Sequence, residues 1–301
     1  MVRHNRISFY ALLLLASLFL ISCNNSGRSM FKTRNNVVFD TISVNSRNYL
    51  EGDTANPYCD ITIDFIYPVS SHKTDVDTLQ LFFVRSMFGT SYDTLQPAAA
   101  VEAYKKNYID NYTYDAKTYS EIVRDMHELN ALIPHMDLTD SEHATEDIFY
   151  SYFENLSDSI VYNQNGILSF QVKQSNNKGG ATSYTSFRNY VFNLNRGYQV
   201  TENEIFNAGY DTALQSLIVA SLLEQNGVKT VDELEDLGFF GIQEIVPNKN
   251  FLLKREGIIY TFNKGEYSAY QLDAPEVLIP YKAIRYLLRE NSIATKLADL
   301  K

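Results

Sequence analysis

Helix-like and strand-like segments of this 301-residue chain gather in separate stretches of sequence instead of alternating. A strand pattern at residues 59–67 is followed by helical patterns at 76–88, 97–108 and 115–133. Strand-like alternation, rich in Tyr, Phe, Val and Ile, then occupies 148–162, 167–174, 183–194 and 251–262. Such clustering is typical of helices packed on antiparallel sheets, whereas parallel sheets go with alternation. We therefore predict an α+β fold with antiparallel sheets, flanking helices and two subdomains.

Proline and glycine set the predicted boundaries of these elements. Pro68 ends the first strand, Gly89 follows the first helix, and Pro97 suits the first turn of the next helix. In the second half of the chain, hairpin turns are predicted at residues 195–197 and 256–257. Three further helices are predicted there, at residues 212–225, 231–237 and 281–290.

The N-terminal segment has the features of a bacterial lipoprotein precursor. Two arginines precede an apolar run at residues 9–21, which is too short to span a membrane and suits a signal-peptide core. The run ends at Leu20-Ile21-Ser22-Cys23, a sequence shaped like a lipobox. We predict that residues 1–22 are removed, that Cys23 is acylated, and that residues 23–36 form a polar tether. An ordinary signal peptide with a chance cysteine is the alternative.

Acylation of Cys23 implies a location in the cell envelope. Two or more acyl chains, such as palmitate, hold a protein stably on a bilayer. Because no acidic surface-export signal follows Cys23, we expect a lipid-anchored body that faces the periplasm from the outer membrane.

The net charge of the chain limits the classes of molecule that it is expected to bind. The formal net charge is −10, and loss of the two arginines in residues 1–22 makes it −12. Nucleic acid is therefore not expected as a partner, because no basic stripe is present to neutralise phosphates. A cationic protein is the electrostatic complement of such a chain. Acidity that only keeps an envelope protein soluble is the alternative.

No segment carries a catalytic or metal-binding signature. Cys59 is predicted to be a small buried residue, and acylated Cys23 leaves it without a disulfide partner. The four histidines beyond the signal peptide do not have the spacing of a zinc-binding helix; they are His72, His127, His135 and His143. Gly179-Gly180 is better explained by a tight turn than by a phosphate-binding loop. We predict no catalytic residue, no metal and no cofactor.

Several segments of the C-terminal half carry a family resemblance. They are Gly179–Ala181, Tyr190–Leu194, Gly257–Asn263, Glu266–Tyr270 and Glu276–Tyr281. In order and spacing they resemble an envelope domain family of unknown function, found in the lysozyme-sensing anti-sigma factor and beside peptidoglycan deacetylase domains. Residues 37–150 resemble the companion N-terminal domain, so the domains are predicted at 37–150 and 151–301. The resemblance implies an extracytoplasmic α+β fold with a binding or sensing role, and it implies no chemistry.

A short motif recurs more often than composition predicts. Asp followed by Ser or Thr and then Ala, Ile or Leu occurs six times. It resembles the O-glycosylation signal of Bacteroidetes envelope proteins, and the alternative is that these pairs are turns or helix caps. The candidate glycosylation sites are Thr41, Thr54, Thr78, Thr94, Ser159 and Thr212.

Together these features predict a non-catalytic, membrane-anchored lipoprotein of the envelope that binds a partner. The partner is either a cationic protein, such as a lysozyme-like enzyme, or a cell-wall glycan, peptidoglycan. The alternatives are a structural or assembly lipoprotein and an enzyme that acts on envelope glycans through carboxylates.

Overall fold

The computed structural model describes residues 31–32, 35–132, 149–179, 183–270 and 272–299. Residues 1–22, Cys23, His135 and His143 lie outside the described residues, so the predictions that concern them stay predictions. No helix in the described ranges is both long enough and apolar enough to cross a membrane.

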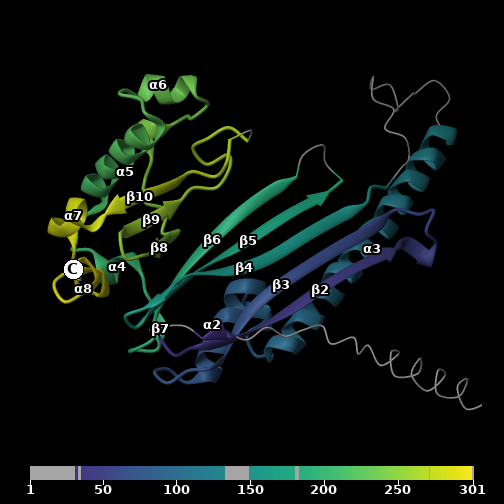
Figure 1. The fold of residues 1–301 in the computed structure, drawn as a ribbon. Helices are drawn as coiled ribbons and strands as arrows, with labels where there is room; N and C mark the ends of the chain where they lie inside the picture. The colour runs from purple at the N-terminus through teal and green to yellow at the C-terminus, as the bar shows by residue number, and fades with distance from the viewer. Residues whose placement is uncertain (1–30, 33–34, 133–148, 180–182, 271, 300–301) are drawn as a thin grey trace, which may run out of the picture.

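A large sheet of seven strands runs through the molecule in the order β1-β2-β3-β4-β5-β6-β7 (Figure 1). Its strands are β1 (Phe31–Lys32), β2 (Val38–Tyr49), β3 (Tyr58–Ser70), β4 (Tyr152–Gln164), β5 (Ile167–Lys178), β6 (Tyr184–Asn193) and β7 (Tyr198–Gln199). Neighbouring strands are antiparallel except β3 and β4, which are parallel. The α+β prediction is therefore confirmed, with one parallel pair inside an otherwise antiparallel sheet.

The parallel pair follows from the connection between β3 and β4. Two helices, α2 (Val76–Phe88) and α3 (Pro97–Leu132), and a short 3-10 turn at Thr90–Tyr92 lie between the two strands. Parallel neighbours need a long crossover of this kind, because a tight turn can only reverse the chain. Both helices pack on the same face of the sheet, where they cover the first hydrophobic core.

Helix α2 has the bounds that the sequence predicts, because both ends are set by local interactions. The Asp75 side chain accepts a hydrogen bond from the Thr78 amide, which caps the start of the helix. Gly89 ends it at φ 98°, a conformation that residues with a Cβ rarely adopt. The buried side of α2 is aromatic: the Phe83 ring stacks on Phe170 of β5, with 4.2 Å between the centroids.

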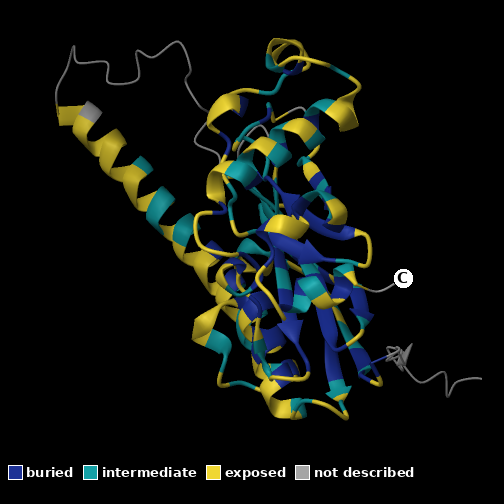
Figure 2. Ribbon diagram, turned by 90° about the vertical axis from the view of Figure 1, so that its left-hand side faces the viewer, coloured by how far each residue is buried: buried dark blue, intermediate teal, exposed yellow. Residues whose placement is uncertain are grey.

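The two helices predicted at residues 97–108 and 115–133 are one helix, α3. No glycine or proline interrupts residues 109–114, and Tyr112 within them is buried against the sheet. Tertiary packing thus carries the helix through the predicted gap. The second half of α3 extends beyond the sheet and is largely exposed (Figure 2).

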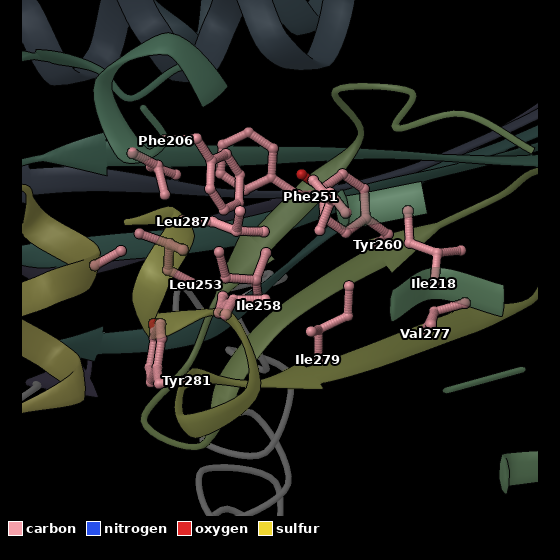
Figure 3. Close-up of a cluster of buried hydrophobic side chains, with 14 of the residues drawn as sticks. Phe206, Ile218, Phe251, Leu253, Ile258, Tyr260, Val277, Ile279, Tyr281 and Leu287 are labelled. Atoms are coloured by element: carbon pink, nitrogen blue, oxygen red, sulfur yellow. The ribbon is translucent and has the colours of Figure 1, made fainter. Parts of the chain in front are cut away.

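The C-terminal part contains a three-stranded antiparallel sheet in the order β10-β9-β8. Its elements are β8 (Phe251–Leu253), β9 (Gly257–Thr261), β10 (Glu276–Pro280), α4 (Glu202–Ile205), α5 (Asp211–Asn226), α6 (Val231–Asp236), α7 (Tyr281–Ile284) and α8 (Ile293–Ala298), with 3-10 turns at Ile242–Glu244 and Arg285–Leu287. Together they enclose a second hydrophobic core (Figure 3). The helix predicted at 281–290 is wrong in its extent, because α7 ends at Ile284 and a 3-10 turn follows.

The two cores share the large sheet. Tyr162, Ile167 and Val191 of strands β4–β6 belong to the C-terminal core, whereas their neighbours on the other face belong to the first core. The boundary predicted between residues 150 and 151 therefore falls between two strands of one sheet, β3 and β4.

Pro68 does not end β3, which continues to Ser70. Proline is tolerated here because β3 pairs with β4 only over Cys59–Asp64, so no bond to β4 is lost at Pro68. Its partner on β2 lies at an irregularity in the register between Val38 and Phe39.

Asparagine side chains fasten the small sheet to β6. Asn263 and Asn250 accept hydrogen bonds from the backbone amides of Phe187 and Asn189, each at 2.7 Å, and both donate to the Phe187 carbonyl. Strand β7 is too short to pair with this part of β6. The amide side chains therefore satisfy backbone groups that an edge strand leaves unpaired.

Candidate functional site

Negative charge is concentrated in one segment of the C-terminal part. Between residues 202 and 245 there are nine carboxylates and one basic residue, Lys229. The carboxylates are Glu202, Glu204, Asp211, Glu224, Asp232, Glu233, Glu235, Asp236 and Glu244. This segment folds into α4, α5, α6 and the 3-10 turn that follows.

Helix α6 presents four of these carboxylates in six residues. Thr230 caps the helix by accepting from the Glu233 amide at 3.2 Å, and Glu233 in turn accepts from the Thr230 and Lys229 amides. Three carboxylates, Asp232, Glu235 and Asp236, remain exposed. Within the described ranges none of the three forms an ion pair, so they are available to a basic partner.

Exposed apolar side chains adjoin α6. The exposed fractions are 47% for Leu237, 45% for Phe240 and 64% for Tyr270. The loops that carry them are joined, because the Phe240 amide donates to the Tyr267 carbonyl and the Ala269 amide donates to the Gly238 carbonyl. These large side chains are therefore presented on a fixed backbone, as binding anchors commonly are.

A groove of about 470 Å³ lies beside them. Leu237, Phe239 and Leu272 supply apolar lining, and Asp273 and Glu276 supply carboxylates. Lys264 approaches Asp273 at 3.9 Å, a distance at which an exposed ion pair contributes little. We call the exposed carboxylates of α6, the three exposed apolar side chains and this groove the acidic face.

Four other carboxyl groups are buried, and each has a structural explanation. Asp40 accepts from the Thr41 amide at 2.8 Å and from the Tyr67 hydroxyl at 3.3 Å, and the remaining three are as follows. Glu202 accepts hydrogen bonds from the hydroxyls of Tyr210 and Tyr260, at 2.7 and 2.9 Å, although it also borders a cavity of about 310 Å³. Glu154 accepts from the Tyr104 hydroxyl at 2.5 Å and from Gln174 at 3.1 Å. The third, Asp158, accepts from a backbone amide inside the large sheet.

Asp158 is a buried carboxyl group whose surroundings disfavour ionisation. Burial raises its pKa well above the usual range, and the nearby charge of Asp64 raises it further, whereas the hydrogen bond from the Ile66 amide lowers it. The other carboxyl oxygen has no hydrogen-bond partner. A group enclosed within the sheet in this way does not meet a substrate, so the raised pKa indicates a neutral structural residue.

The candidate glycosylation sites are scattered over the surface. Thr54, Thr78, Thr94, Ser159 and Thr212 are exposed and Thr41 is partly buried. Thr78 lies in the first turn of α2, where its hydroxyl is 3.2 Å from an oxygen of the capping residue Asp75. The sites therefore do not form one cluster, and their modification stays a prediction.

Cys59 is buried in the first core, as predicted, and burial raises the pKa of its thiol to about 11. His72 and His127 are exposed. Among the side chains that the structure describes, no group of three or more His, Cys, Asp or Glu residues has the arrangement of a metal site.

Sequence reasoning found the overall acidity but not the acidic face. A count of charges in successive segments would have identified residues 202–245. The contribution of Tyr270 could not be found in this way, because its loop meets α6 only through contacts between residues distant in sequence.

Part of this half of the chain is similar to a protein domain of unknown function. Residues 203–282 match the family model described as "Protein of unknown function (DUF3298)". That range includes α5, α6 and the small sheet, and with them every residue of the acidic face. No curated protein matches the chain.

Two crystal structures are similar to this chain over most of its length. A DUF3298 family member from Bacteroides fragilis NCTC 9343 is 28% identical, with a TM-score of 0.74, and the match covers 89% of this chain and 100% of that one. A DUF3298 family protein from Pseudomonas aeruginosa PAO1 is 14% identical, with a TM-score of 0.55, and covers 83% of this chain and 94% of that one. The second likeness concerns the fold alone.

Proposed function

We propose that this protein is a non-catalytic, lipid-anchored envelope protein that binds a cationic protein through the acidic face. The single observation that carries the proposal is the exposed, unpaired carboxylate cluster of α6 beside large apolar side chains. Charge draws a basic partner to the surface, and buried aromatic contacts then hold it. Lipid on Cys23 would keep the complex at a membrane of the envelope, with the body in the periplasm.

The resemblance to the family of the lysozyme-sensing anti-sigma factor suggests which class of cationic protein the partner is. Lysozyme-like enzymes are strongly basic, so they complement a surface rich in carboxylates. The companion domain assigned to residues 37–150 would then serve as the support for the binding half.

Binding of lysozyme to the full-length protein, measured by biolayer interferometry, tests the proposal. The triple variant Asp232→Asn, Glu235→Gln, Asp236→Asn removes three charges from α6 and leaves the capping Glu233 in place. We expect its affinity to fall by about tenfold or more, since each close charge pair across an interface contributes on the order of 1 kcal/mol. The wild-type affinity should also fall as salt is raised.

A matched variant on α3 is the control. Glu121→Gln, Asp125→Asn, Glu128→Gln removes the same charge from an exposed helical surface elsewhere in the molecule. It should bind lysozyme within about twofold of the wild type, because only long-range attraction changes. Equal weakening by both variants, or no binding by the wild type, would contradict a docking site on α6.

A structural or assembly role is the second candidate, and the second half of α3 favours it. Ile122, Met126, Leu129 and Leu132 are exposed and follow helical spacing, with Leu132 78% exposed. A stripe of this kind is suited to pairing with another helix. Concentration-dependent association in light scattering, abolished by Met126→Lys, would support this role.

A further inference from the structure

The large sheet has one face that the helices do not cover. Along β3, Ile61 and Ile63 point into the first core beneath α2 and α3, whereas Thr62 and its alternate neighbours point to the opposite face. The small sheet covers one end of that face, where the Ser169 hydroxyl of β5 donates to the Leu253 carbonyl of β8 at 2.8 Å and Val191 of β6 joins the C-terminal core. The middle of the face is therefore open to solvent.

The register of five strands aligns a row of small polar side chains across this face. The row consists of Asn45, Thr62, Asn155, Ser175 and Thr185, which are paired in turn from β2 to β6. Asn45 and Asn155 are exposed and the other three are partly exposed. The hydroxyls of Ser175 and Thr185 lie 2.8 Å apart, so they are oriented by one another. We call these five residues the polar row.

The surroundings of the polar row are electrically balanced. On one side Arg47 and Asp60 form an ion pair through two hydrogen bonds, which neutralises both charges. On the other side Asp64 carries a negative charge, and Lys173 carries a positive charge and lies 5.9 Å from the centre of the Phe187 ring. In a chain with a net charge of −10, the four charged side chains that flank the polar row sum to zero, and Glu276 of the acidic face meets this face only farther along β5, at Gln171.

We propose that this face binds a neutral glycan chain that lies across the strands along the polar row. Hydroxyl and amide groups match sugar hydroxyls and N-acetyl groups as hydrogen-bond partners, without the cost of desolvating a charge. Strands are about 4.8 Å apart, which is close to the length of one pyranose unit, so successive sugars would meet successive strands.

The neighbouring aromatic rings add to this match. Phe153 and Phe187 flank the polar row on its two sides, and both are partly exposed. Aromatic faces contact the C–H surface of sugar rings, which gives such a platform apolar contact as well as hydrogen bonds. The polar row shares no residue with the acidic face, so either proposal can be wrong while the other is right.

Titration with neutral pentasaccharides tests the inference. Cellopentaose and the pentamer of N-acetylglucosamine would be added to the full-length protein, with binding followed by calorimetry and by amide shifts in NMR. At least one oligosaccharide should bind, with shifts centred on the polar row. The variant Asn155→Ala, Ser175→Ala removes two hydrogen-bonding side chains and should weaken binding about tenfold, which corresponds to about 1.4 kcal/mol.

The acidic-face variant Asp232→Asn, Glu235→Gln, Asp236→Asn is the control and should bind the oligosaccharides like the wild type. Conversely, the polar-row variant should bind lysozyme normally. Absence of binding at millimolar oligosaccharide, shifts centred on another surface, or unchanged affinity in the polar-row variant would overturn the inference. Should the variant fold poorly, the location of the wild-type shifts decides the question alone.

Discussion

Asp158 in the large sheet and Glu202 in the C-terminal core are both buried carboxyl groups, but their partners differ. Glu202 accepts a tyrosine hydroxyl at each oxygen, whereas Asp158 accepts one backbone amide and has an oxygen without a partner. A carboxylate that is fully hydrogen-bonded holds its surroundings together, whereas one that is only partly bonded weakens the fold when it ionises. The two cores thus place the same chemical group in opposite energetic roles.

The largest effect is expected when Glu202 is removed. Glu202→Ala leaves the buried hydroxyls of Tyr210 and Tyr260 without an acceptor and opens a cavity, so the free energy of unfolding should fall by about 3–5 kcal/mol. Urea denaturation followed by circular dichroism measures it. Glu202→Gln keeps the size and one acceptor, and it should lose much less. Equal losses in the two variants would contradict this account, because they would show that the retained size and the retained acceptor of glutamine contribute nothing.

A change of opposite sign is expected at Asp158. The folded state raises the pKa of this carboxyl group, so the wild type loses stability as the pH rises through that pKa. Asp158→Asn does not titrate and should be more stable by about 1–3 kcal/mol at pH 8. The difference should shrink as the pH is lowered, because the wild-type group is then protonated in both states. A variant less stable than the wild type at pH 8 would contradict the neutral role.

The smallest effect is expected from single hydroxyls around Glu202. Tyr260→Phe and Tyr210→Phe each remove one hydrogen bond to the carboxylate and keep the ring packing. Each should lower the free energy of unfolding by about 1–2 kcal/mol, since one oxygen of Glu202 then loses its donor. The double variant tests cooperation: a loss larger than the two single losses combined would show that the hydroxyls support one another.

An element could be predicted from the sequence where nearby residues set its ends, and it could not where contacts between distant residues set them. Helix α2 could be bounded from the sequence because Asp75 and Gly89, which end it, are adjacent to it. The length of α3 could not, because the burial of Tyr112 against the sheet decides it. The parallel pairing of β3 with β4 was also beyond sequence patterns, since it depends on where a 36-residue helix returns the chain.

The candidate sites divide in the same way. The negative charge of α6 can be predicted from the sequence, because its acidic residues are consecutive or nearly so. The polar row is not, because Asn45 and Thr185 come together only through the register of four strand pairs. A surface that takes one residue from each of several strands cannot be recognised in the sequence of any single segment.

The asparagine side chains bound along β6 protect this strand edge from pairing with other molecules at high protein concentration. A bare strand edge is a template on which a second molecule can add its own strand, the first step towards fibres. At Phe187 and Asn189 that template is already occupied by Asn263 and Asn250 of the same molecule. Molecules held at high density on a surface could therefore touch along this edge without adding strands to one another's sheets.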